Sequence, residues 1–103
     1  MKKLRLLLEY KCFPVWLYDE NGNLVDNDSP VELKSNMELD DRLTKMQAEY
    51  DGLYEDSETQ FEYVGFTDTE QKRAFEDEIE QVYRKIKELV GESYYVENSI
   101  KLL

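Results

Sequence analysis

Two stretches of this 103-residue chain repeat apolar side chains at alternating spacings of four and three residues. Such spacing places every member of a set on one face of a helix, so each stretch predicts an amphipathic helix with one apolar stripe. A helix with a single stripe buries it against another element, which restricts the fold to packed layers. The first stripe consists of Leu39, Leu43, Met46, Tyr50 and Leu53, and the second of Phe75, Ile79, Val82, Ile86 and Leu89.

Residues that favour helix ends stand on both sides of these stripes. For the first helix, we expect Ser35 or Asn36 to cap the start and the helix to run to about Tyr54. For the second, the segment 67–70 (Thr-Asp-Thr-Glu) predicts a capping box with threonine at the cap position. We expect this second helix to end at Gly91, acting as a left-handed C′ residue.

Short apolar runs before, between and after the helices predict strands. Residues 3–11 alternate loosely, residues 13–18 alternate more regularly, and Asn21-Gly22 after them indicates a type I′ hairpin turn. Two further strands are expected at residues 60–66 and 94–96. The order β-β-β-α-β-α-β predicts a single α+β domain over residues 1–103, with a mostly antiparallel sheet and two amphipathic helices packed on it.

Composition restricts the partners and the compartment of the chain. Its hydrophobic content of 41% is too high for a disordered acidic tail. The net charge of -11 disfavours direct binding to nucleic acid or to an anionic membrane, and it favours a basic protein as partner. Cys12 has no second cysteine with which to form a disulfide, and the apolar run Leu6–Leu8 is too short for a signal peptide or a membrane span. We therefore expect a soluble, cytoplasmic protein.

No pattern of residues indicates catalysis, a cofactor or a metal site. The chain has no histidine, which excludes Ser-His and Cys-His nucleophile pairs. Asp19, Asn21 and Asn23 have the spacing of the first calcium-loop ligands, but Leu24 and Pro30 stand where Gly and Glu are required, so we interpret the segment as a turn. Paired carboxylates catalyse glycoside hydrolysis without histidine, yet nothing in the sequence selects such a pair. We expect a protein that is not an enzyme.

The middle of the chain is acidic and contains no basic residue. Between Lys45 and Lys72, eight carboxylates are interleaved with aromatic side chains. Crowded like charges repel one another, so such a segment is either held in water as a solvated rim or offered to a positively charged partner. The sequence leaves both interpretations open. The carboxylates are Glu49, Asp51, Glu55, Asp56, Glu58, Glu62, Asp68 and Glu70.

Several of these acids have no oppositely charged neighbour at helical spacing. Asp51 and Glu55 form a like-charge i,i+4 pair near the expected end of the first helix, where the helix dipole also disfavours negative charge. Glu76 and Glu80 repeat this spacing on the second helix. Together with aromatic residues that would supply desolvated anchors, they give the candidate partner-binding residues Asp51, Tyr54, Glu55, Asp56, Glu58, Glu62, Tyr63, Glu76 and Glu80.

Two segments of the chain and its general character resemble a known class of bacterial protein. The segments are Tyr50-Asp51-Gly52-Leu53-Tyr54-Glu55-Asp56 and the opening run from Phe13-Pro14-Val15-Trp16 to Asn21-Gly22-Asn23. With the short length, the α+β order and the lack of a catalytic set, the chain resembles the small acidic immunity proteins of contact-dependent and other polymorphic toxin systems. The resemblance implies a protein that neutralises a cognate toxin, often a nuclease with a basic cleft, by covering or distorting its active site.

These observations lead to one main hypothesis and two alternatives. The main hypothesis is a non-enzymatic inhibitor that binds a basic toxin domain, which we expect to be a nuclease, through the acidic residues of 51–62. The first alternative is a DNA mimic that occupies a DNA-binding protein, or another acidic protein-interaction module. The second is a small enzyme that uses paired carboxylates. The oligomeric state is open.

Overall fold

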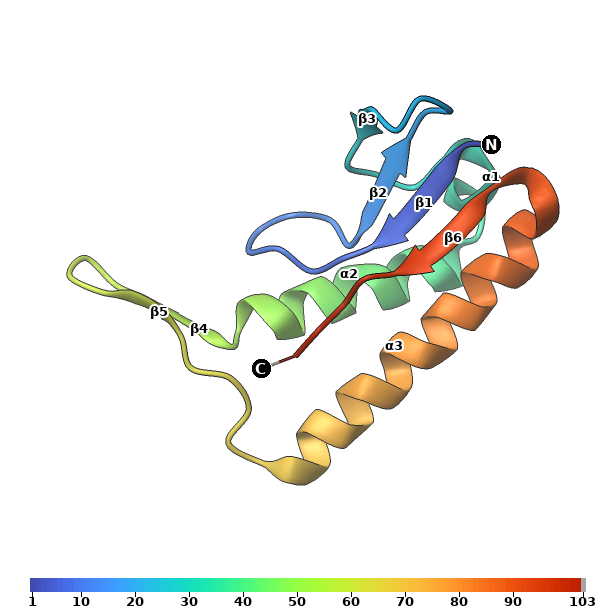
Figure 1. The fold of residues 1–103 in the computed structure, drawn as a ribbon. Coiled ribbons are helices and arrows are strands. Elements are labelled where there is room, and N and C mark those ends of the chain that lie inside the picture. Colours follow the sequence, from blue (N-terminus) through green and yellow to red (C-terminus); the bar gives the residue numbers. More distant parts are fainter. Residues whose placement is uncertain (103) are drawn as a thin grey trace.

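The computed structural model describes residues 1–102 and contains two sheets and three α-helices (Figure 1). The strands are β1 (Lys3–Leu6), β2 (Val15–Tyr18), β3 (Leu24–Asp26), β4 (Tyr54–Asp56), β5 (Phe61–Tyr63) and β6 (Tyr95–Asn98). The helices are α1 (Val31–Lys34), α2 (Met37–Asp51) and α3 (Thr69–Val90), followed by the 3₁₀ turn η1 (Gly91–Ser93). The α+β class expected from the sequence is confirmed.

The main sheet has four strands in the order β3-β2-β1-β6. β1 pairs antiparallel with β2 on one side and parallel with β6 on the other. Alternation along β1 sends Leu4 and Leu6 towards the helices, opposite Leu17 and Val15 of β2. The expected mostly antiparallel arrangement therefore holds for every described strand pair except β1 with β6.

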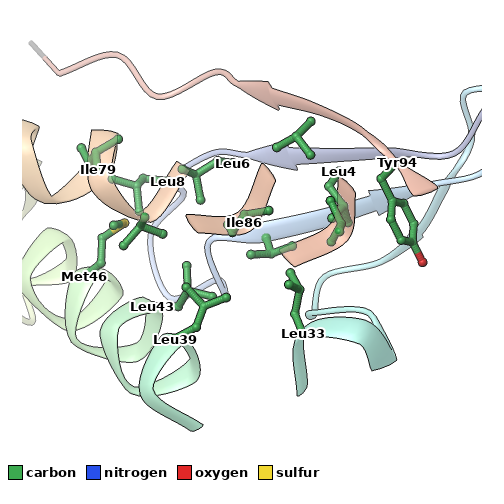
Figure 2. Close-up of a cluster of buried hydrophobic side chains, with 14 of the residues drawn as sticks. Leu4, Leu6, Leu8, Leu33, Leu39, Leu43, Met46, Ile79, Ile86 and Tyr94 are labelled. Carbon is green, nitrogen blue, oxygen red and sulfur yellow. The ribbon is translucent and has the colours of Figure 1, made fainter. Parts of the chain in front are cut away.

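The core lies between one face of the main sheet and the helices (Figure 2). Full burial of one large aliphatic side chain contributes about 1.5–3 kcal/mol, so this cluster is the main source of stability. It includes Leu4, Leu6 and Leu8 from β1 and its extension, Leu33 from α1, Leu39, Leu43 and Met46 from α2, and Phe75, Ile79, Val82 and Ile86 from α3.

The two predicted apolar stripes form the buried faces of α2 and α3, with differences at their C-terminal ends. α2 ends at Asp51, so the predicted run to Tyr54 is too long, although Leu53 is still buried after the helix. On α3, Leu89 is 36% exposed and Val90 is buried in its place. The reason is that a 4-3-4-3 pattern drifts slowly around a helix with 3.6 residues per turn.

Local hydrogen bonds decide where the helices begin. The Asn36 side chain caps α2, because its Oδ1 accepts the Leu39 N–H at 2.9 Å. α3 starts one residue later than the predicted capping box, so Thr67 is not the cap. Asp68 takes that position and its Oδ1 accepts the Glu70 N–H at 2.8 Å, where its negative charge also favours the positive end of the helix dipole.

The β2–β3 hairpin is present, but its turn is not type I′. Gly22 has a positive φ of 85°, whereas Asn21 does not, and type I′ requires a positive φ at both central residues. The Gly22 N–H instead donates to the Asp19 carbonyl at 3.1 Å, and Asp19 Oδ1 accepts the N–H groups of Asn21 and Asn23 at 2.9 Å each. Asp19, the first residue of the rejected calcium loop, is thus used by the turn itself.

A second, two-stranded sheet extends the structure beyond the end of α2 (Figure 1). The strand expected at 60–66 is present but shorter, as β5. Its partner β4 begins at Tyr54, where the sequence predicts the end of the first helix, and no strand is predicted there. Gly52, which follows α2, separates the helix from β4. The β4–β5 hairpin therefore contains four of the eight carboxylates of the base-free acidic segment, Glu55, Asp56, Glu58 and Glu62.

Candidate functional site

The β4–β5 hairpin presents two chemically different faces. Its register pairs Tyr54 with Tyr63, Glu55 with Glu62, and Asp56 with Phe61. Because side chains alternate along a strand, the middle pair points away from the other two pairs. We call Glu55 and Glu62 the acidic face, and the pairs Tyr54–Tyr63 and Asp56–Phe61 the aromatic face.

The acidic face places two carboxylates directly opposite each other. Glu55 and Glu62 are both exposed, and neither has a salt bridge or side-chain hydrogen bond to any residue of 1–102. Like charges at directly opposed positions of an antiparallel pair destabilise it. Glu58, at the turn that joins the strands, adds a third exposed carboxylate without an ion pair in the described chain. The acidic face is thus negative and unneutralised.

The aromatic face attaches the hairpin to the rest of the protein. The Tyr54 and Phe61 rings are stacked, with their centroids 5.3 Å apart and their planes at 11°. The ring of Tyr10, from the loop between β1 and β2, lies 4.7 Å from the Tyr54 ring and 5.0 Å from the Phe61 ring. At the base of the hairpin, the hydroxyl oxygens of Tyr50 and Tyr54 are 2.7 Å apart.

Burial and hydrogen bonding alter the acidity of the tyrosines in this cluster. Burial raises the pKa of the Tyr50 hydroxyl far above its usual value, and the hydrogen bond with Tyr54 acts in the same direction. The pKa of Tyr10 is also raised, by desolvation and then by its hydrogen bond and charge contact with Asp56. Both hydroxyls are therefore neutral hydrogen-bonding groups at physiological pH.

Asp51 has a different environment from the acids of the hairpin. It is half-buried, and its Oδ1 accepts the Lys11 N–H at 2.9 Å and Gln47 Nε2–H at 2.8 Å. Lys11 has a positive φ of 60°. The Asp51 carboxylate thus fastens the β1–β2 loop to the end of α2, a role that its sequence position gave no reason to expect.

Glu76 and Glu80 lie on α3 and not on the hairpin. They flank a shallow hollow between α3 and the segment after β6, whose apolar walls include Ile79 and Ile100. Glu80 Oε1 accepts a hydrogen bond from Arg84 Nε at 3.0 Å. The structure thus brings together Tyr54, Glu55, Asp56, Glu58, Glu62 and Tyr63 on one hairpin, with Asp51 beside it, and leaves Glu76 and Glu80 on a separate element.

Lys3 and Arg5, two of the basic N-terminal residues, lie away from the acidic face of the hairpin. Lys3 and Arg5 lie on the face of the main sheet opposite to the helices, with the Lys3 Nζ 4.9 Å from the centroid of the Tyr18 ring. Arg5 Nε donates to Glu97 Oε2 at 2.9 Å. Neither Lys3 nor Arg5 therefore forms an ion pair with a carboxylate of the β4–β5 hairpin.

Tyr10 is the residue of this site that sequence reasoning missed. It is separated from Asp56 by 46 positions, yet its hydroxyl donates to Asp56 Oδ2 at 3.1 Å. It stands in a basic segment, near the end of the strand expected over residues 3–11, so no charge pattern or periodicity links it to the acidic region. The pairing of β1 with β2 and the hydrogen bonds of Gln47 and Asp51 in α2 together place the intervening loop against the hairpin.

Other kinds of site have little support in the described part of the chain. Residues 1–102 contain no group of three or more Cys, Asp or Glu side chains arranged to hold a metal ion. Within the same residues, none of the helices combines the length and the apolar character needed to span a membrane.

Comparison with known proteins relates the chain to a protein family. A protein-family model described as Serratia CdiI immunity protein-like matches residues 2–99, which is nearly the whole chain. The search of curated proteins found no match. The matched range includes the main sheet up to β6, all three helices and the entire β4–β5 hairpin.

Proposed function

From the premise that the chain belongs to the Serratia CdiI immunity protein-like family, we propose that it binds a basic toxin domain through the acidic face of the β4–β5 hairpin. Family membership gives the general role, which is that of an immunity protein that neutralises a toxin. The proposal adds the nature of the partner, a nuclease with a basic cleft, and the surface that contacts it.

The observation that carries the proposal is the opposed pair Glu55 and Glu62. Two exposed carboxylates at paired positions cost the free hairpin stability, and no described cation offsets that cost. A lysine or arginine of a partner would relieve the repulsion on binding. The free energy that the pair costs the unbound protein would thus favour the complex.

The position of the hairpin supports the same partner. It extends past the end of α2, away from the main sheet, so its acidic face and its turn are accessible to a concave surface (Figure 1). A nuclease binds phosphates with lysine and arginine residues, and such a cleft is complementary to a narrow negative hairpin. The net charge of -11 would also accelerate the encounter with a basic protein at low ionic strength.

Charge reversal on the acidic face tests the proposal. The cognate toxin domain would be titrated with wild type, Glu55→Lys, Glu62→Lys and the double variant, by surface plasmon resonance at several salt concentrations. We expect each single variant to slow association and to weaken affinity by at least about tenfold, or about 1.4 kcal/mol. The salt dependence should be smaller for the variants than for wild type.

Glu20→Lys and Glu92→Lys are matched controls. Both residues are exposed, lie outside the hairpin and have no salt bridge in the described chain, so each control changes the net charge by the same amount as a test variant. If the controls weaken binding as much as the hairpin variants, net charge and not the acidic face is responsible. Competition by duplex DNA for basic proteins other than the toxin would favour a DNA mimic instead.

A further inference from the structure

Tyr10 contacts the outer part of the β4–β5 hairpin from another element of the fold. Its ring is 5.0 Å from that of Phe61 at an angle of 63°, an edge-to-face arrangement, and 4.7 Å from that of Tyr54. Its hydroxyl donates to Asp56 at 3.1 Å. One side chain therefore contacts both strands of the hairpin, including its outermost pair, Asp56 and Phe61.

Within residues 1–102, the hydrogen bonds of Leu53 and Tyr50 attach the hairpin at its base. The N–H groups of Val64 and Gly65 both donate to the Leu53 carbonyl, at 2.8 and 3.1 Å, and the Tyr50 hydroxyl meets that of Tyr54. These bonds fix where the strands leave the body of the protein. They do not determine the orientation of the outer half of the hairpin. That orientation depends on contacts further along the hairpin, where Tyr10 lies.

The loop that bears Tyr10 is itself held in place on α2. Gln47 Nε2 donates to the Glu9 carbonyl at 2.8 Å and to Asp51 at 2.8 Å, and the Lys11 N–H donates to the same carboxylate. Gln47 is buried, with 8% of its surface exposed. Bonds on both sides of Tyr10 in sequence thus tie its backbone to the helix and make the side chain a fixed support.

We infer that Tyr10 is a positioning residue, which holds the β4–β5 hairpin in the orientation that presents the acidic face to the toxin. This inference rests on the proposed function. A two-stranded hairpin is marginally stable in water by itself, and a partner must also order any segment that is mobile in the free protein. Contacts from Tyr10 order the hairpin in advance, so the fraction of molecules that is competent to bind rises.

Hydrogen exchange of the toxin-free protein tests the attachment. Amides of residues 54–63 would be followed by mass spectrometry in wild type, Tyr10→Ala and Tyr10→Phe. Loss of two ring contacts and one hydrogen bond in Tyr10→Ala should accelerate their exchange by about tenfold. Tyr10→Phe keeps the ring and loses only the bond to Asp56, so we expect about a two- to threefold increase.

Amides of α2 and α3 serve as an internal reference in the same samples, since a loss of global stability would accelerate them as well. Tyr95→Ala is the matched control, because Tyr95 is an exposed tyrosine on β6 of the main sheet. It should leave exchange at 54–63 unchanged. Equal exchange at 54–63 in wild type and Tyr10→Ala would overturn the inference.

Toxin binding then tests whether the attachment matters for recognition. We expect Tyr10→Ala to weaken affinity at least about threefold, chiefly through slower association, and Tyr10→Phe to lie between it and wild type. Faster exchange with unchanged affinity would show that the orientation of the hairpin does not serve binding. If Glu55→Lys and Glu62→Lys left binding unchanged, the proposed surface would be wrong, and the exchange result would still decide separately whether Tyr10 holds the hairpin.

Discussion

The acidic face makes an unusual prediction, namely that one substitution stabilises the hairpin and weakens its function. In Glu62→Lys, the opposed carboxylates become an oppositely charged cross-strand pair with Glu55. An opposite-charge pair contributes roughly 0.2–1 kcal/mol, and the substitution also removes a repulsion of similar size. Both side chains are exposed, so solvent screening limits the total to about 1 kcal/mol at low salt.

The measurement is hydrogen exchange at residues 54–63 of the free protein, in parallel with toxin binding. About 1 kcal/mol corresponds to roughly fivefold slower exchange, since 1.4 kcal/mol is tenfold. Glu62→Gln removes the repulsion without adding attraction and should give about half of this effect. Near 1 M salt, where the screening length is about 3 Å, the three proteins should converge.

Two results would refute this reasoning. Faster exchange in Glu62→Lys than in wild type would mean that Glu55 and Glu62 do not repel each other in the free hairpin. Slower exchange together with unchanged or tighter toxin binding would mean that their repulsion has no connection with the partner. Glu58→Lys is the control for stability, because Glu58 lies in the turn outside the three strand pairs and has no directly opposed carboxylate.

Three further predictions concern the body of the protein. Leu43→Ala should lower the free energy of unfolding by about 2–5 kcal/mol in urea titrations followed by circular dichroism, because the side chain is 0% exposed in the core. Asp68→Ala should cost about 0.5–2 kcal/mol in the same assay, and Asp68→Asn much less, because either polar side chain caps α3. Hydrogen bonds from Ser99 and Arg5 lower the pKa of Glu97 below its ordinary 4.5. The stability that this carboxylate contributes is therefore complete above pH 4.5 and is lost as the pH falls through the lower, folded-state pKa. In Glu97→Gln, the free energy of unfolding should depend less on pH in that acidic range.

Sequence periodicity predicted those parts of the fold that are specified locally. The spacing from Leu39 to Met46 and from Phe75 to Ile86 fixes the buried faces of α2 and α3, because helix geometry brings residues three and four apart together. β4 was missed because Leu53, one residue before it, continues the spacing of the helical stripe and is buried after the helix has ended. Periodicity alone does not distinguish a buried residue inside a helix from a buried residue that follows its end.

Pairings between distant segments had no local signal. The parallel pairing of β1 with β6 joins residues about 92 positions apart, and the contact of Tyr10 with Asp56 spans 46 positions. The acidic segment itself was evident from charge alone. The strand register places Glu55 opposite Glu62, and the position of the helix end places Asp51 in hydrogen bonds with the β1–β2 loop. Composition encodes neither the register nor the helix end.

The parallel pairing of β1 with β6 also has a consequence for synthesis of the protein. β1 is an interior strand of the main sheet, and one of its two neighbours is the last strand of the described chain. During translation, the edge of β1 that pairs with β6 therefore stays unpaired until β6 has left the ribosome. Contacts of such long sequence separation form slowly. The main sheet is thus complete only after β6, the last strand of the described chain, has docked beside β1.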